Sequence, residues 1–179
     1  MKTKYSEKIA VPEGITCNIE GKKIICQKGS VSLERVITPV NITAEAKGGE
    51  IIIECKAGNK TDYKKITSYL AHLKNMFAGL NEQYVYHLEA CNVHFPMGLK
   101  IEANKLIVSN FLGEKTPRQA VIIPNVKVDI KGQIITISSS DKEAAGQTAA
   151  NFEKATKIRY RDRRVFQDGI YITQKPGDK

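Results

Sequence analysis

The sequence has little of what marks catalytic, redox and membrane proteins. Tryptophan is absent, aromatic residues make up 7% of the 179 residues, and there are three histidines. It has no Gly-x-Ser-x-Gly elbow and no glycine loop ending in Gly-Lys-Ser/Thr, and its acidic residues are scattered. No apolar run approaches the roughly 18 residues of a transmembrane helix, and no apolar signal segment follows residues 1–5. We therefore expect a soluble, cytoplasmic protein that is not an enzyme.

The cysteines and histidines do not form a convincing metal site. The four cysteines (Cys17, Cys26, Cys55 and Cys91) contain no Cys-x-x-Cys pair, and the first three lie among strand-like apolar residues, so we expect free thiols that are mostly buried. His87, Cys91 and His94 could suggest zinc. On an alternating strand, however, residues 87 and 91 share a face that excludes residue 94, and a fourth ligand is missing. We predict no metal site.

Positive charge is the most informative property of the composition. The chain has 28 Lys+Arg against 19 Asp+Glu, for a net charge of +9, and this predicts attraction to a polyanion. Residues 91–179 carry 15 basic and 9 acidic residues, whereas residues 1–90 carry 13 and 10. Nucleic acid is the favoured partner. An anionic membrane is the weaker alternative, because the amphipathic segment with basic residues needs its apolar face for the core.

An internal repeat with a period near 84 residues organises the chain. Pro12-Glu13-Gly14-Ile15 is echoed by Pro96-Met97-Gly98-Leu99. In each copy an alternating apolar hairpin follows, over about residues 15–26 and 99–108, and a loop then leads to a second hairpin, over about residues 42–55 and 126–137. The repeat predicts two copies of one structural unit.

A helix is predicted after the second hairpin of each copy. In the first copy, apolar residues recur at steps of three and four from about Thr61 to Phe77. In the second copy, Ser140 and Glu143 form a capping-box pattern that predicts the helix start. One more strand-like piece follows each helix, at residues 84–88 and at Val165-Phe166 with residues 170–172.

These elements predict an α+β fold built by internal duplication, in which each lobe packs antiparallel strands on one helix. The predicted lobes are residues 1–82 and residues 83–179, and we expect the short tail 175–179 to be disordered.

The strongest functional signal is a basic cluster near the end of the chain. Residues 154–164 hold six basic residues and one acid, for a local charge of +5. Arginine presents a planar fork that binds phosphate bidentately, and Tyr160 could add a face for stacking on a base. A solvated basic surface without a partner is the alternative.

A second candidate is the loop 113–119, which contains Lys115, Pro117 and Arg118. Its counterpart in the first copy, the segment 30–35, is far less basic, which suggests that the second lobe faces RNA. Neither an RRM signature nor a KH loop is present, so we expect recognition of a folded RNA through phosphates and 2′-hydroxyls.

Four stretches of the chain resemble one known family. Arg161-Asp162-Arg163-Arg164-Val165-Phe166-Gln167-Asp168-Gly169-Ile170-Tyr171-Ile172 looks like the C-terminal signature of the sixth protein of the large ribosomal subunit, universal type, in its archaeal and eukaryotic form. Segments 75–80, 94–96 and 110–115 also resemble it, and the likeness covers essentially the whole chain. The short tail departs from longer eukaryotic members and favours an archaeal source.

The resemblance implies a duplicated α+β fold, no catalytic residue and no cofactor. It implies binding to large-subunit rRNA, mainly through the second lobe, near the translation-factor site and the sarcin–ricin loop. Neighbouring ribosomal proteins would be further partners, and translation GTPases would lie nearby. Asp168 and Gly169 fit the family's turn and are expected to be structural. The residues expected to contact rRNA are Lys115, Arg118, Lys157, Arg159, Arg161, Arg163 and Arg164. The alternative function is a basic protein-interaction module outside the ribosome.

Overall fold

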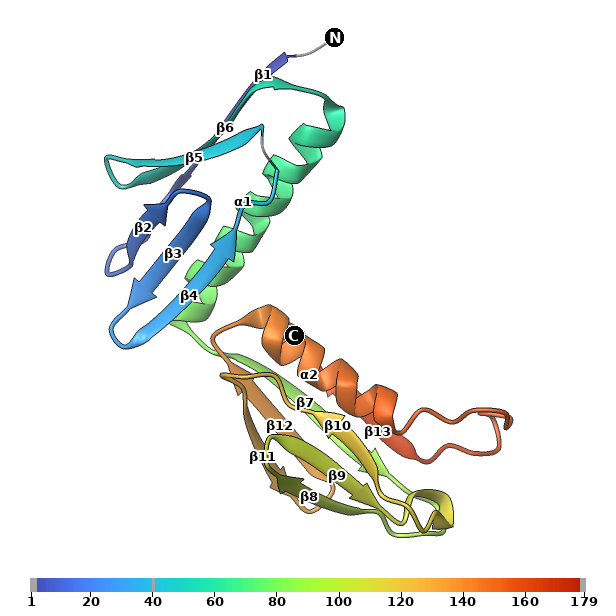
Figure 1. Cartoon of the computed structure of the whole chain (residues 1–179). Coiled ribbons are helices and arrows are strands. Elements are labelled where there is room, and N and C mark those ends of the chain that lie inside the picture. Colours follow the sequence, from blue (N-terminus) through green and yellow to red (C-terminus); the bar gives the residue numbers. More distant parts are fainter. Residues whose placement is uncertain (1–2, 40, 178–179) are drawn as a thin grey trace. The chain divides into compact units, whose positions relative to one another are not determined.

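The chain forms two compact units, Met1–Glu82 and Gln83–Lys179. The computed structural model describes residues 3–39 and 41–177, and Figure 1 shows the course of the chain through each unit. Both units combine antiparallel strands with one long α-helix, so the predicted α+β class is confirmed.

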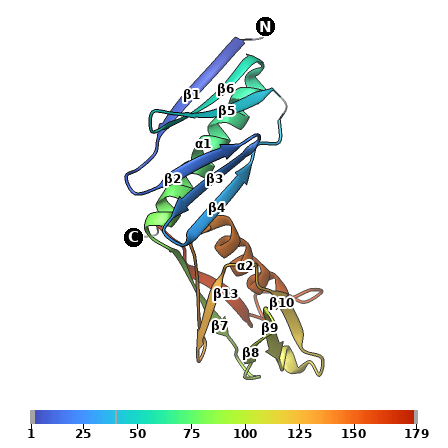
Figure 2. The same ribbon diagram turned by 60° about the vertical axis from the view of Figure 1, so that its left-hand side comes forward.

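Unit 1 contains two three-stranded sheets and one helix. The first sheet has the order β1-β6-β5 and the second the order β2-β3-β4. Helix α1 packs against strands of both sheets, as Figures 1 and 2 show. The elements are β1 (Thr3–Ala10), β2 (Thr16–Glu20), β3 (Lys23–Lys28), β4 (Val31–Val36), β5 (Ile42–Lys47), β6 (Glu50–Gly58) and α1 (Lys60–Asn81).

Unit 2 repeats this arrangement with one strand added. Its sheets have the orders β10-β9-β8 and β11-β12-β7-β13, and α2 packs on β7, β10, β12 and β13. The elements are β7 (Tyr84–Cys91), β8 (Gly98–Glu102), β9 (Lys105–Ser109), the short 3-10 turn η1 (Phe111–Gly113), β10 (Arg118–Val121), β11 (Lys127–Lys131), β12 (Ile134–Ser139), α2 (Lys142–Ala155) and β13 (Gly169–Gln174).

The two units have matching topologies. Strands β1 to β6 correspond in order to β7 to β12, and α1 corresponds to α2. The difference is β13, which pairs with β7 on the side away from β12, whereas β1 pairs only with β6 among the described strands. The chain between α2 and β13 therefore has no counterpart in unit 1.

Each unit has its own apolar core. In unit 1, Ile24, Ile51, Ile53 and Ile66 are buried between the sheets and α1. The core of unit 2 includes Leu88, Leu106, Ile135 and Phe152. The inner face of α2 is small, with Ala145 and Ala149 fully buried, because the helix lies close to the sheet beneath it. Gly146 illustrates this distance: a Cβ there would lie 3.0 Å from the hydroxyl of Tyr86.

Three strands lie where the sequence did not predict them. Residues 3–10 were not predicted as a strand, but they form β1, in which Tyr5 and Ile9 turn inward. The segment 30–35 was predicted as a loop, but most of it belongs to β4, which pairs with β3. The loop 113–119 ends early, because Arg118 opens β10 and pairs opposite Val108.

The helix boundaries differ from the prediction by four residues or fewer. Helix α1 begins at Lys60, where the backbone N–H of Asn59 donates to Asp62 at 3.0 Å, and it extends to Asn81 rather than Phe77. The prediction of Ser140 as the cap of α2 was wrong: Asp141 is the cap, and its carboxylate accepts from the backbone of Glu143 at 2.9 Å. Asp141 is placed directly before the first helical residue, where this bond can form.

The end of the chain also departs from the prediction in part. Val165 lies in a turn and is 71% exposed, so it is not part of a strand. The strand β13 begins at Gly169, directly after the buried Asp168. Residues 175–177 continue past β13 as a turn, whereas Asp178 and Lys179 lie outside the described residues. The predicted disorder of the tail stays a prediction.

Candidate nucleic-acid interface

The basic cluster forms the connection between α2 and β13, which we call the α2–β13 loop (residues 157–168). In both ribbon views this loop extends past the end of α2, away from the sheets of unit 2 (Figures 1 and 2). Lys157, Arg159, Arg161, Arg163 and Arg164 are all exposed on it. The added segment of unit 2 and the densest positive charge are thus the same stretch of chain.

Two buried polar side chains fix the ends of the α2–β13 loop. Thr156 is 2% exposed, and its hydroxyl accepts from the backbone N–H of Ile170 at 2.9 Å. Asp168 is 6% exposed, and its carboxylate accepts from the backbone N–H of Val93 at 2.6 Å. A hydrogen bond to a charged acceptor inside a protein is strong, because water does not compete for it. The loop therefore leaves and rejoins the fold at fixed points.

Arg118 ties the α2–β13 loop to β10. Its Nη1 donates to the carbonyl oxygens of Ala155 at 3.0 Å and Lys157 at 3.3 Å. Its Nε and Nη2 donate to the two carboxylate oxygens of Glu114 at 2.8 and 2.6 Å. The guanidinium also lies over the ring of Phe111, 4.2 Å from the centroid. Every nitrogen of this guanidinium is thus engaged within the protein.

The contact with Arg118 lowers the pKa of Glu114. The hydrogen bonds from Arg118 favour the ionised carboxylate and hold the pKa of Glu114 below its ordinary value, with smaller contributions from the charges of Arg118 and Arg161. Glu114 is therefore an anion over the neutral pH range. It neutralises Arg118 and leaves the charge of the other arginines available.

The α2–β13 loop is also ordered internally. Asp162 accepts from the backbone N–H and from the guanidinium of Arg164, at 2.9 and 2.8 Å, and these bonds lower the pKa of Asp162. The backbone of Phe166 donates to the carbonyl of Asp162 at 3.0 Å, and the guanidinium of Arg161 lies 4.9 Å from the centre of the Phe166 ring. Arg164 nevertheless keeps 91% of its side chain exposed.

Two hollows accompany the basic side chains. A cleft of about 510 Å³ lies between the end of α2, the α2–β13 loop and β13, and Lys157, Arg159 and Arg163 line it together with Tyr171. A smaller hollow of about 210 Å³ lies between the loop and η1, and Arg159, Arg161 and Arg118 line it with Glu114. Arg159 lines both. An anionic group can enter this concave, positively charged surface and pair with the basic side chains that line it.

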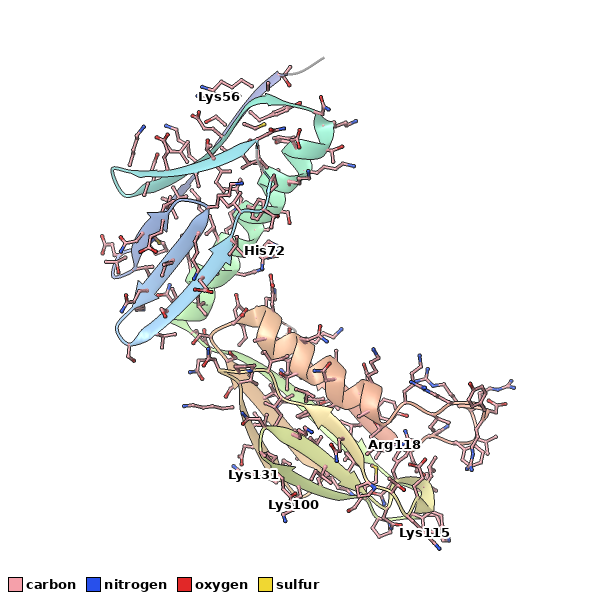
Figure 3. The ribbon with its side chains drawn as sticks, in the orientation of Figure 1. Lys56, His72, Lys100, Lys115, Arg118 and Lys131 are labelled. Atoms are coloured by element: carbon pink, nitrogen blue, oxygen red, sulfur yellow. The ribbon has the colours of Figure 1, made fainter. Side chains whose placement is uncertain are left out.

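Lys115 reaches this region from a different element. It is exposed in the loop between η1 and β10, and Figure 3 places its label on the same side of unit 2 as that of Arg118. The seven predicted residues thus come from two segments, 115–118 and 157–164, which the bonds of Arg118 join. Arg118 differs from the other six, because it is partly buried and fully engaged.

Sequence reasoning missed the residues that hold this surface in place. Thr156 and Glu114 were not singled out, and Asp168 was expected only to fit a turn. A threonine at the end of α2 and an aspartate before β13 have no spacing signature, because their partners lie 14 and 75 residues away in sequence. The signal that could have found Glu114 is its four-residue separation from Arg118.

The zinc hypothesis that the sequence raised involves His87, Cys91 and His94. His87 lies on β7 with its ring 3.5 Å from the hydroxyl of Thr136, and His94 packs its ring on Phe95. Within residues 3–39 and 41–177, no group of three or more His, Cys, Asp or Glu side chains is placed to hold a metal ion.

Among the helices described, none has the length and apolarity to cross a bilayer.

All four cysteines are free thiols, as expected. Cys26 and Cys55 are buried, Cys17 is half-buried and Cys91 is exposed. The Sγ atoms of Cys17 and Cys26, which face each other across β2 and β3, lie 2.9 Å apart. Burial raises the pKa of both thiols.

Fold and site together define a class: a duplicated α+β protein whose second copy carries an anchored cationic loop. Comparison with known proteins agrees with this description and specifies it. The family model described as "Ribosomal protein L6" matches residues 95–169, which include the whole α2–β13 loop.

Three archaeal relatives match over nearly their whole length. The "Large ribosomal subunit protein uL6" of Methanocella arvoryzae is 39% identical over 178 residues, covering 98% of this chain and 99% of the relative. The proteins of that name from Methanococcus vannielii and Methanosarcina mazei are each 36% identical, covering 96% and 98% of this chain and 94% and 99% of their own lengths.

The chain therefore belongs to the uL6 family of large-subunit ribosomal proteins. This confirms the resemblance seen in the sequence, and the relatives agree with its archaeal form. The family consists of structural ribosomal proteins rather than enzymes, which agrees with the prediction of a non-catalytic protein.

Proposed function

We propose that this protein is a structural component of the large ribosomal subunit in the cytoplasm, and that it binds large-subunit rRNA near the translation-factor site and the sarcin–ricin loop. The observation that carries the proposal is the anchored cationic loop of unit 2 in a chain that belongs to the uL6 family. Other ribosomal proteins would be neighbours in the subunit, and translation GTPases would act close by.

The geometry of the α2–β13 loop supports RNA as the ligand. Arg159, Arg161 and Arg163 are exposed cations at spacings of two residues, beside two concave surfaces. Such an array fits a backbone of regularly spaced phosphates better than a single small anion. Because the loop is fixed before RNA arrives, the arginines can read the shape of a folded RNA rather than wrap around a flexible one.

The seven predicted residues have different roles in this proposal. Lys115, Lys157, Arg159, Arg161 and Arg163 contact phosphates. Arg118 holds the loop through Ala155, Lys157 and Glu114. Arg164 shapes the turn through Asp162, and its exposed side contributes positive charge.

The test is crosslinking of the tagged full-length protein in cells, followed by sequencing of the bound RNA. We expect one sharp peak on a large-subunit rRNA segment next to the sarcin–ricin loop. The triple variant Arg159→Ala, Arg161→Ala, Arg163→Ala should lose this peak.

A matched control removes three exposed lysines of unit 1, with Lys56→Ala, Lys64→Ala and Lys74→Ala (Lys56 is labelled in Figure 3). Both triple variants lower the net charge from +9 by three. The control should keep the rRNA peak if the position of the charge matters. Equal loss in both variants would mean that only overall charge attracts RNA. Retention on an acidic protein after nuclease treatment, without an rRNA peak, would support the interaction module instead.

A further inference from the structure

Tyr160 combines two unfavourable features at the outer part of the α2–β13 loop. Its backbone φ is +59°, in the left-handed region that side chains with a Cβ rarely adopt. Its side chain is 104% exposed, whereas Tyr86, another tyrosine of unit 2, is 9% exposed. A large aromatic ring in strained backbone and in full contact with water stabilises neither the loop nor the core.

The loop does not depend on Tyr160 for its conformation. Its ends are fixed by Thr156 and Asp168, and its turn is held by the bonds between Asp162 and Arg164. Glycine or asparagine would satisfy a positive φ at lower cost. The presence of tyrosine at this position therefore needs a reason outside the folded chain.

The surroundings of Tyr160 indicate the chemistry of its partner. Arg159 and Arg161 flank it in sequence, and both are exposed and line the smaller hollow beside η1. A partner that satisfies both arginines is anionic, and one that covers the ring of Tyr160 is flat and apolar on one face. An unpaired nucleotide combines both properties, because its base stacks on aromatic rings and its phosphates pair with arginine.

We propose that Tyr160 is a base-stacking residue, which receives an unpaired base of large-subunit rRNA while Arg159 and Arg161 hold the phosphates on either side of it. This inference rests on the proposed function and adds to it a contact with a base. It gives the α2–β13 loop a preference for an RNA site with a splayed nucleotide over a regular helix.

Substitution by glycine separates a binding role from a structural one. Tyr160→Gly relieves the positive φ, so the full-length variant should unfold at the same or a higher temperature than the wild type. Its affinity for large-subunit rRNA should nevertheless fall about tenfold or more, as expected for the loss of one stacked base. Tyr160→Asn should behave in the same way, and Tyr160→Phe should keep the wild-type affinity because the ring is retained.

A spectroscopic readout tests the stacking contact directly. The chain has no tryptophan, so Tyr160→Trp introduces a single indole. Titration with large-subunit rRNA should quench its fluorescence, because a base stacked on the indole quenches its excited state by electron transfer. The control Tyr63→Trp places the indole on α1 of unit 1, and its fluorescence should not change.

The outcomes distinguish this inference from the proposed function. If the wild type shows no specific binding to large-subunit rRNA, the proposed function fails. If the wild type binds and Tyr160→Gly binds equally well, with no quenching of Tyr160→Trp, the stacking inference fails and the proposed function stands. If Tyr160→Gly keeps its rRNA affinity but loses a neighbouring ribosomal protein from the subunit, the ring serves a protein contact, and the inference is again overturned.

Discussion

Two arginines of unit 2 use the same guanidinium chemistry for different purposes. Arg118 donates to a carboxylate and to two carbonyls, and it covers the ring of Phe111. Arg161 contacts the ring of Phe166 and is otherwise open to solvent. From the sequence, both arginines were predicted only as basic residues in or near a loop. The structure shows that Arg118 holds the α2–β13 loop in place, whereas the charge of Arg161 is exposed.

We expect Arg118→Ala to affect stability and Arg161→Ala to affect RNA binding. Arg118→Ala leaves two carbonyls and Glu114 without their donor, and should lower the free energy of unfolding by about 1–3 kcal/mol, measured with urea. Arg161→Ala should leave stability within about 0.5 kcal/mol, yet lower the slope of log affinity against log salt by about one. A lower salt slope for Arg118→Ala would show that its guanidinium contacts phosphate after all.

The free cysteines provide a second test at this scale. Cys91 should react first with a thiol reagent, because it is exposed, and Cys26 and Cys55 should react only on unfolding. Partial burial and the charge of Glu89 raise the pKa of Cys91, so its thiolate appears at higher pH than that of a free cysteine. The labelling rate should therefore still be rising above pH 8.5 or so, where a free thiol is half ionised. Cys91→Ser should abolish the fast phase, and a fast phase that remains in this variant would contradict the assignment.

At the scale of elements, the periodic segments were predictable, whereas three edge strands, β1, β4 and β10, were not. In the hairpins over residues 15–26 and 99–108, the central strands β3 and β9 alternate because one face of each is buried. Strand β10 has four residues, of which only Ala120 is buried, and in β4 no residue is fully buried. Such short or half-exposed strands are held by backbone pairing with β9 and β3, and backbone pairing leaves no pattern in the side chains.

The candidate site also contains residues that were predictable from the sequence and residues that were not. Its cations were found from the sequence, because charge density is a local property. Its anchors were not found, because Thr156 and Asp168 act through bonds to Ile170 and Val93, which only the folded chain brings to them.

Asp168→Ala tests whether the anchor matters for binding. Loss of the bond to the N–H of Val93 should lower the free energy of unfolding by about 1–3 kcal/mol, measured by urea unfolding, and Asp168→Asn should lower it less because the amide oxygen can still accept. Removal of a negative charge should by itself strengthen attraction to RNA. We expect the opposite, a weaker affinity of Asp168→Ala in an rRNA titration, because the loop is no longer fixed. Stronger binding by this variant would mean that charge outweighs geometry.

At the scale of the whole molecule, the two units are nearly equal in charge. Residues 1–82 contain 13 basic and 9 acidic residues, and residues 83–179 contain 15 and 10. Net charge therefore does not explain why one unit would bind RNA in preference to the other. The difference lies in β13 and the loop before it, which gather the charge of unit 2 at one place.

We expect the fragment 83–179 to fold alone, since it has a complete core, and to keep most of the rRNA affinity of the full chain. The fragment 1–82 should also fold but bind rRNA weakly and without preference for a site. Circular dichroism and filter binding at two salt concentrations would measure both properties. Equal binding by the two fragments would contradict the proposed role of the α2–β13 loop.

The fixed ends of the α2–β13 loop also bear on the kinetics of assembly. A loop that becomes ordered only on binding loses conformational entropy at that moment, and this slows productive encounter. Here Thr156 and Asp168 have already restricted the chain during folding. Productive collisions with RNA should therefore be frequent, steered by charge, and the lifetime of the complex should depend on how well the RNA fits a surface that does not rearrange.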